Sequence, residues 1–159
     1  MQTYQVGLIG LALFAILAAF AFLAWKRRVR DQERLLDKPV VIAERTSGHS
    51  AFYVATTFAN RPLDRVIAFG LAHRGRCTLH SSPSGIDVSR VGEVSFQIPR
   101  TALLGVGASS AVIDRAVETN GLITLRWRLG KEEVESHFRF VSDRVQTEAL
   151  NDLDLVIGV

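Results

Sequence analysis

Cysteine is nearly absent from this sequence, which has Cys77 as its one example among 159 residues. A lone cysteine cannot form a disulfide within the chain, which is consistent with a reducing compartment. We predict a strand for the segment RCTLH, in which His80 points to the face opposite Cys77 because side chains alternate along a strand. This alternation excludes a Cys/His catalytic dyad and favours Cys77 as a small core residue.

Charge is absent from the first 25 residues. The run from Val6 to Trp25, VGLIGLALFAILAAFAFLAW, has 20 uncharged residues, and a helix of that length extends about 30 Å, the thickness of a bilayer's hydrocarbon core. We therefore predict a membrane-spanning helix bounded by Val6 and Trp25. The alternative, a buried helix of a soluble protein, would need a far larger partner core than the other 134 residues supply.

Positive charge follows the predicted span at once, at Lys26, Arg27, Arg28 and Arg30. A cleaved signal peptide has the reverse order, with its positive charge before the apolar run. Because Lys and Arg favour the cytoplasmic side, we expect a single-pass protein of the cell membrane. Its N-terminus should lie outside and its C-terminal domain in the cytoplasm, with these four basic side chains at the membrane interface beside the lipid bilayer.

The excess of positive charge in the chain comes from these four residues next to the predicted span. The sequence pI is about 9.5, but from Asp31 onward 15 Lys and Arg stand against 16 Asp and Glu. We therefore expect no nucleic acid as a partner of the domain.

Familiar patterns for catalysis and metal binding are missing. The four histidines have no pair at the spacing of three to five residues common in zinc motifs; they are His49, His73, His80 and His137. The glycines at 105 and 107 lack the rest of a phosphate-binding loop, and Ser81–Gly85 lacks the spacing of a hydrolase elbow. We predict no catalytic residue, no metal site and no cofactor, and expect that the protein is not an enzyme.

Strand signals recur beyond residue 50. Runs of β-branched and aromatic residues separated by turn residues predict about seven strands, at 51–58, 75–81, 86–89, 94–98, 104–108, 122–129 and 133–141. The segment after Pro39 can form either a further strand or an extended connector. Between the first two predicted strands, Pro62 can open a short helix that Gly70 closes.

The last two predicted strands are joined by Gly130-Lys131, a loop that suits a type II′ turn. Counting from that turn gives the register of the pair, in which Leu129 faces Glu132, Arg128 faces Glu133, Trp127 faces Val134, Arg126 faces Glu135 and Ile123 faces Phe138. The charged pairs favour a solvated sheet face over a ligand site. His137 falls on the same outer face, where we predict a surface histidine.

A helix follows this hairpin. Ser142 can cap it, and it should run to about Asp154 before a frayed tail; its apolar stripe is Val145, Ala149, Leu150 and Leu153. We therefore predict a mainly-β barrel of about seven antiparallel strands, capped by a C-terminal helix, with Trp127, Phe138 and Phe140 inside. The chain divides into an anchor (1–25), a basic juxtamembrane stalk and connector (26–50) and a cytoplasmic domain (51–155).

Seven strands followed by one helix is the plan of the pleckstrin-homology-like (PH-like) barrel. The runs YVATTFANRPLDRVIAFGLAHRGR (53–76), IPRTALLGVG (98–107) and IDRAVETNGLITLRWRLG (113–130) resemble an actinobacterial family of single-pass membrane proteins with such a domain. The resemblance covers about two thirds of the chain. It implies a bacterial inner-membrane protein of the kind often described only as an export or membrane protein and encoded near pyrimidine-biosynthesis enzymes, and it brings no catalytic residues.

These observations favour a non-enzymatic interaction or scaffold module, held at the cytoplasmic face and binding a protein partner. The alternative is an accessory or regulatory subunit of a transport or export complex. Four arginines are the candidate partner or ligand surface: Arg61, Arg65, Arg74 and Arg76. They correspond to the loop where eukaryotic PH domains often hold phosphoinositides, but Asp64 dilutes the cluster and bacteria commonly lack those lipids, so a phosphoinositide partner is not expected.

Overall fold

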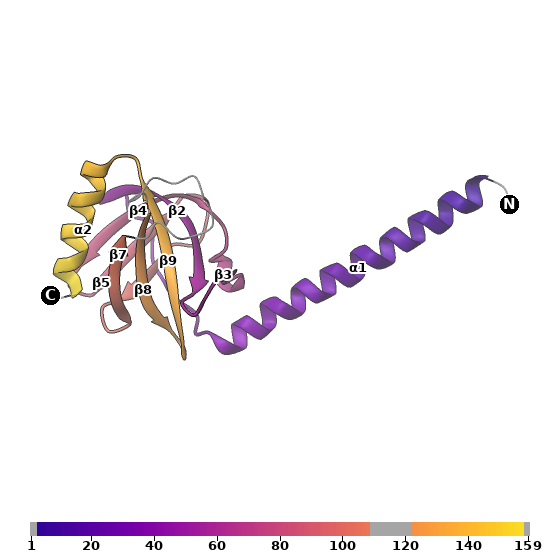
Figure 1. The fold of residues 1–159 in the computed structure, drawn as a ribbon, viewed down its shortest axis with the longest axis horizontal. Helices are drawn as coiled ribbons and strands as arrows, with labels where there is room; N and C mark the ends of the chain where they lie inside the picture. The colour runs from indigo at the N-terminus through magenta and orange to yellow at the C-terminus, as the bar shows by residue number, and fades with distance from the viewer. Residues whose placement is uncertain (1–2, 109–121, 158–159) are drawn as a thin grey trace.

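The chain folds into one long helix and a β-domain closed by a second helix (Figure 1). The structure is a computed structural model that describes residues 3–108 and 122–157. Helix α1 (Thr3–Leu35) extends away from the domain, and helix α2 (Asp143–Ile157) lies on the domain's opposite side. The predicted fold class, an N-terminal apolar helix followed by an antiparallel β-domain and a C-terminal helix, is confirmed.

Helix α1 runs unbroken through the predicted span and into the first part of the basic stalk. It ends at Leu35, four residues before Pro39, which cannot continue a helix. The helix is long and apolar enough to cross a membrane, and none of its apolar window is buried against the rest of the protein.

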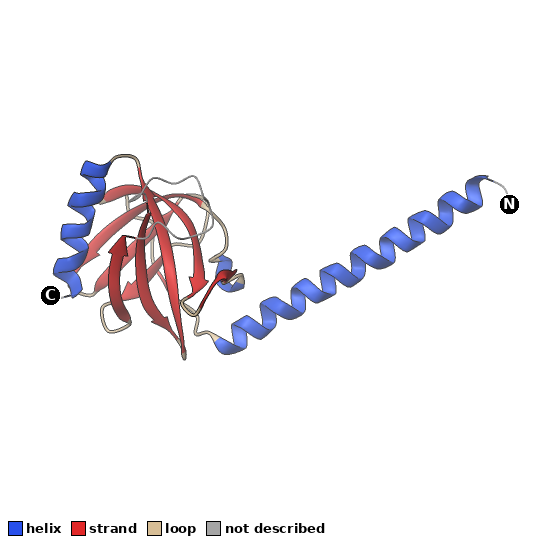
Figure 2. Ribbon diagram, in the orientation of Figure 1, coloured by secondary structure: helices blue, strands red, loops and turns tan. Residues whose placement is uncertain are grey.

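Every strand pair among the described residues of the β-domain is antiparallel (Figure 2). In the described ranges the strands are β1 (Val40–Val41), β2 (His49–Phe58), β3 (Arg61–Arg65), β4 (Gly75–Ser82), β5 (Gly85–Arg90), β6 (Phe96–Pro99), β7 (Leu103–Ala108), β8 (Leu122–Leu129) and β9 (Glu132–Phe140). Their order is β1-β6-β5-β4-β2-β9-β8-β7, and β3 pairs with the end of β2. Each of the seven predicted strands has a counterpart, and β1 and β3 are additional.

The short helix predicted from Pro62 to Gly70 is wrong. Arg61–Arg65 instead forms β3, which pairs with Thr57 and Phe58 of β2. Pro62 is compatible with this because it lies in a strand at the margin of the sheet, where a missing N–H leaves no ladder bond unmade. The helical part of this segment is one 3₁₀ turn, η1 (Ala68–Gly70), in which Phe69 has a positive φ of 57°.

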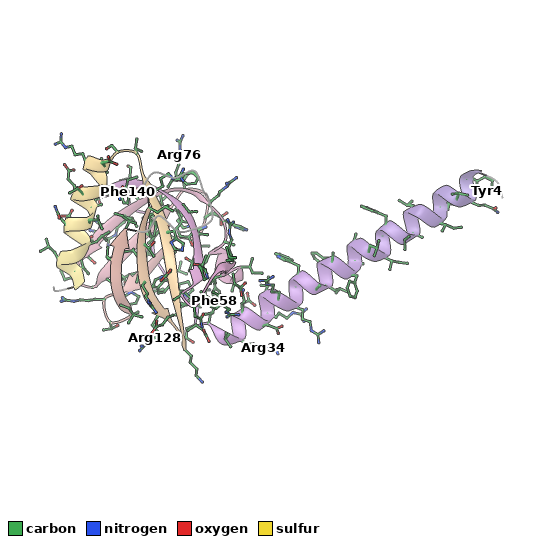
Figure 3. The ribbon with its side chains drawn as sticks, in the orientation of Figure 1. Tyr4, Arg34, Phe58, Arg76, Arg128 and Phe140 are labelled. Carbon is green, nitrogen blue, oxygen red and sulfur yellow. The ribbon has the colours of Figure 1, made fainter. Side chains whose placement is uncertain are left out.

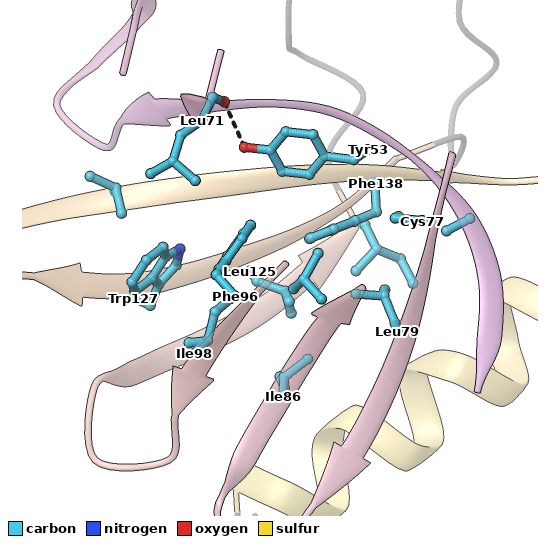
Figure 4. Close-up of a cluster of buried hydrophobic side chains, with 14 of the residues drawn as sticks. Tyr53, Leu71, Cys77, Leu79, Ile86, Phe96, Ile98, Leu125, Trp127 and Phe138 are labelled. Atoms are coloured by element: carbon cyan, nitrogen blue, oxygen red, sulfur yellow. Dashed lines mark hydrogen bonds between the residues drawn. The ribbon is translucent and has the colours of Figure 1, made fainter. Parts of the chain in front are cut away.

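The core fills the space between the bent halves of the sheet (Figure 4). Trp127 stacks on Phe96 with ring centroids 6.0 Å apart, and Tyr53 packs edge-on against Phe96 and Phe138. Trp127, Phe138 and Phe140 are buried as predicted. Cys77 is also buried in this cluster, while His80 lies on the other face of β4, so the predicted alternation is confirmed.

The β8–β9 hairpin has the predicted register from Leu129 opposite Glu132 to Ile123 opposite Phe138. Gly130 has a φ of 68° whereas Lys131 does not have a positive φ, which fits a type II′ turn. The ion pair on the outer face is diagonal: Arg126 binds Glu133 at 2.6 Å, although Glu135 is its directly opposite neighbour.

His137 does not lie on the surface, and that prediction is wrong. The ring is fully buried, with Nε2 3.0 Å from the Thr57 hydroxyl and Nδ1 3.0 Å from the Thr124 hydroxyl. His137 keeps its place in the alternation of β9, between Glu135 and Arg139, and lies opposite Ala55 of β2 and Thr124 of β8. Both faces of the sheet are buried at this point, since every residue from Ala55 to Phe58 of the neighbouring strand is buried. The side on which His137 lies was therefore predicted correctly, but its exposure was not.

Helix α2 begins next to Ser142 as predicted. The Ser142 hydroxyl accepts a long hydrogen bond of 3.5 Å from the Val145 N–H. The predicted stripe packs on the domain, with Ala149 and Leu153 fully buried. The expected fraying from Leu155 is wrong, because the helix continues to Ile157 and Val156 is buried against the core.

Candidate functional site: the helix–domain junction and the domain surface

The C-terminal end of α1 is attached to the domain by one buried amide. The Gln32 side chain accepts hydrogen bonds from the N–H groups of Ile67 (2.7 Å) and Ala68 (3.1 Å), and donates one to the Arg65 carbonyl (3.1 Å). These backbone groups lie between β3 and η1, where no strand ladder is available to them. Gln32 therefore completes the hydrogen bonding of the loop and fixes the helix to it.

Two further contacts strengthen this junction. Leu36, the residue after α1, is buried in the main core. At the β8–β9 turn, a Cβ added to Gly130 would lie 2.8 Å from the Asp37 backbone nitrogen, so the chain leaving α1 passes directly against the hairpin. We call the contacts of Arg28, Gln32, Leu36 and Asp37 with the domain the junction.

Arg28 extends the junction toward the predicted membrane. Its guanidinium forms an ion pair with Asp64 of β3, and Arg61 approaches the same carboxylate at 3.3 Å. The Arg61 guanidinium also lies over the Phe58 ring, 4.5 Å from its centroid. Side chains from α1 and β3 thus share one small, mostly exposed charge cluster.

The structure divides the four predicted surface arginines into two groups. Arg61 and Arg65 are the ends of β3, beside the junction, and Arg65 pairs with Thr57. Arg74 is exposed just before β4, and Arg76 pairs with Phe52, five residues back along β2 from Thr57. Figure 3 shows Arg76 on the opposite margin of the domain from Phe58, the β2 residue that pairs with Arg61. The four arginines therefore do not form one continuous patch.

A cavity of about 470 Å³ opens at the other end of the domain, between the end of α2 and the β4–β5 hairpin. Its rim holds a hydrogen-bonded pair, His49 and Asp152, whose Nε2 and Oδ2 atoms are 2.7 Å apart. Arg100 and His80 add polar edges to a mainly apolar floor that includes Leu79. Nothing in the sequence analysis pointed to this cavity, because its residues come from four separate segments.

Arg90 of β5 is buried inside the domain. Its Nη2 donates to the carbonyls of Gly70 (3.0 Å) and His73 (3.2 Å), and the guanidinium lies 4.7 Å from the Tyr53 ring centroid. Nη1 is buried without a hydrogen-bond partner among the described residues. Arg90 thus supports the strained η1 turn from within, and it is not accessible to a partner from outside.

Burial shifts the pKa values of ionisable side chains in the core, and it raises that of the Tyr53 hydroxyl. Burial raises the pKa of the Cys77 thiol to about 12, which keeps it protonated and unreactive. Burial lowers the pKa of His137 to about 4, so that the ring is neutral at physiological pH. Within residues 3–108 and 122–157, the acidic, histidine and cysteine side chains form no cluster of three that could hold a metal ion.

A family model described as bacterial PH domain-like matches residues 33–154, from the last turn of α1 to the last turn of α2. The chain belongs to this bacterial PH-like family. The match covers all the described strands and most of the closing helix, and it begins one residue after Gln32. No curated protein matches the chain.

The segment between the predicted anchor and the predicted domain is attached to the domain. The predicted boundaries at residues 25 and 50 stay predictions, but the segment between them is not a free linker in the structure. Val40 and Val41 pair with β6, and the Arg45 N–H donates to the Ser89 hydroxyl at 2.8 Å. Sequence reasoning missed Gln32 and Leu36; the apolar pair Leu35-Leu36 within a charged stalk was a signal of the attachment.

Proposed function

We propose that this bacterial PH-like protein is a membrane-anchored, non-enzymatic interaction module that presents its domain at the cytoplasmic face of the cell membrane. The observation that carries the proposal is the junction: an apolar helix of membrane-spanning length continues without a break into a helix end that is fastened to the domain. A flexible tether would only concentrate the domain near the membrane. A fastened helix also orients it.

The orientation follows from charge. Lys26, Arg27, Arg28 and Arg30 lie between the apolar helix and the domain, on the side that the positive-inside rule assigns to the cytoplasm. With α1 in the membrane, α2 lies on the side of the domain away from the bilayer (Figure 1). The cavity lined by the end of α2 lies on that side too. The resemblance to actinobacterial membrane proteins supports a bacterial plasma membrane and adds nothing about the chemistry of the partner.

The test is crosslinking in living cells, comparing the native chain with one in which residues 6–25 are replaced by an unrelated membrane-spanning helix. An interaction module keeps its crosslinked protein partner after the replacement. Loss of that partner would favour an accessory subunit that works within a membrane complex through α1. Absence of a crosslinked partner with either chain would contradict both functions.

The two arginine groups provide matched variants for the same experiment. Arg74→Gln/Arg76→Gln removes charge at one margin of the domain, and Arg61→Gln/Arg65→Gln removes it beside the junction. If the predicted arginine surface binds the partner, at least one pair reduces crosslinking several-fold. Unchanged crosslinking with both pairs would move the docking surface elsewhere on the domain.

A further inference from the structure

The first four residues of β3, Arg61–Asp64, lie beside the part of α1 that leaves the predicted span (Figure 1). We call this segment the β3 tip. Its contacts with α1 are the Arg28–Asp64 ion pair and, one residue further along β3, the bond from Gln32 to the Arg65 carbonyl. The height of the tip above the membrane can therefore be counted along the helix.

Arg28 lies three residues beyond Trp25, which is about 4.5 Å along the axis, and Gln32 lies seven residues beyond it, or about 10 Å. The headgroup layer on each side of a bilayer is roughly 5–8 Å thick. With Trp25 at the edge of the hydrocarbon core, Arg28 lies in the headgroup layer and Gln32 just outside it. The β3 tip, held against Arg28, is at headgroup level.

The side chains of the tip suit that level. Leu63 is 83% exposed, next to Pro62, and packs on nothing in the domain core. A single exposed leucine means little by itself, but here it stands beside the basic end of a membrane helix. Asp64 is paired with both Arg28 of α1 and Arg61, so these three side chains together present one net positive charge to anionic lipid.

We propose that the β3 tip rests in the headgroup layer of the bilayer that holds α1, with Leu63 at the boundary of the acyl chains and Arg61 on lipid phosphates. This inference rests on the proposed membrane anchoring of α1. The occupant of the surface is the bilayer itself, recognised by its anionic headgroups and apolar edge and not by one particular lipid. The domain then touches the membrane at two points.

The experiment uses the full chain in lipid nanodiscs, with Cys77→Ala removing the buried native thiol. Single cysteines at three exposed positions carry an environment-sensitive dye: Leu63→Cys in the tip, Phe14→Cys in the middle of α1 and Leu155→Cys on α2. Phe14 and Leu155 are 70% and 75% exposed, close to the exposure of Leu63, so they serve as matched controls. Lipids bearing a nitroxide near the headgroup or deep in the acyl chain quench the dye according to its depth.

We expect headgroup-level quenching at residue 63 that is at least several-fold stronger than at residue 155, and deep quenching at residue 14. Quenching at 14 with none at 63 above the level at 155 would overturn the tip contact alone. No quenching at 14 would overturn the membrane anchoring, and with it the proposed function.

Arg61→Gln tests the charge on the tip. In nanodiscs that contain phosphatidylglycerol, this change should reduce quenching of the residue 63 dye about two-fold, whereas nanodiscs of phosphatidylcholine alone should show little difference. Equal quenching before and after the change in the anionic nanodiscs would contradict the role of Arg61 on lipid phosphates.

Discussion

His137 lies between the hydroxyls of Thr57 and Thr124, and this position couples the folding of the domain to pH. A neutral imidazole donates a hydrogen bond from one ring nitrogen and accepts one at the other, and a hydroxyl can be the partner in either bond. Burial favours this neutral form and lowers the pKa of His137 from its ordinary value of 6.5 to about 4.

Between pH 6.5 and pH 4 the unfolded chain binds a proton at His137 that the folded chain excludes, so stability falls as the pH is lowered through this window. The full loss is about 3 kcal/mol, since one pKa unit corresponds to about 1.4 kcal/mol. Urea unfolding at pH 7.5, 5.5 and 4.5 measures it. His137→Gln should flatten the pH dependence, and His80→Gln, at a partly exposed position, should leave it unchanged.

Arg90 gives a second prediction at this scale. Arg90→Met removes the donors to the Gly70 and His73 carbonyls and leaves both without those bonds. We expect the domain to lose on the order of 3 kcal/mol. The matched change Arg139→Met, at an exposed site on β9, should cost less than 0.5 kcal/mol. Equal urea midpoints for the two variants would contradict a supporting role for Arg90.

Single residues also mark the limit of prediction from sequence. Cys77 followed from strand alternation, because β4 is regular where it lies. The burial of His137 did not, because the threonines that face it come from segments about 80 and 13 residues away. Buried polar networks of this kind leave no local pattern in the chain.

Among the elements, α1 depends on the junction for its fixed angle to the domain. Gln32→Leu keeps the volume of the side chain but removes three hydrogen bonds, which should destabilise the domain by about 2–3 kcal/mol. Glu33→Ala, on the exposed side of the same helix, is the control. Electron paramagnetic resonance between spin labels on α1 and α2 should give a broader distance distribution for Gln32→Leu than for the control.

Helix α2 contributes to stability through its buried stripe. Leu153→Ala creates a cavity where the side chain is 1% exposed, and should cost about 2–5 kcal/mol. Leu155→Ala, two positions along on the exposed side, should be nearly neutral. Thermal unfolding of both variants measures the difference; similar melting temperatures would mean that α2 is not part of the cooperative unit.

The elements themselves were largely readable. The β8–β9 register followed from one glycine turn and the need to keep Arg126 and Arg128 out of the core. The conformation of the β3 segment could not be predicted, because Pro62 and Gly70 are equally compatible with a short helix and with an edge strand. Pairing with β2 makes this segment a strand, and the residues of the segment itself do not reveal that pairing.

At the scale of the whole molecule, the proposed topology depends on where the basic residues lie. Moving the charges of Lys26, Arg27 and Arg30 to the N-terminal end of α1 should reverse the orientation of the chain in the membrane. Arg28 stays, since it also pairs with Asp64. A C-terminal reporter that is active on only one side of the membrane measures the result, and an unchanged signal would contradict an orientation set by these charges.

The overall plan was predictable because each part of it has its own pattern: an uncharged run, a series of short strands and one amphipathic helix. The candidate arginine surface was harder to predict. Arg61, Arg65, Arg74 and Arg76 are neighbours in sequence, yet the β2–β4 pairing carries the second two to another margin of the domain. Proximity along the chain was a poor guide to proximity in space.

The junction also couples the rotation of α1 about its own axis to the orientation of the domain. A helix advances about 100° per residue, and because the domain is fastened at Gln32, any turn of the span about its own axis turns the domain with it. One alanine inserted after Lys26 would swing the domain through about a quarter of a circle, whereas seven inserted residues would return it almost to its starting azimuth. With α1 in the membrane as proposed, the side of the domain that faces a neighbouring membrane protein is thus set by the rotational position of the helix.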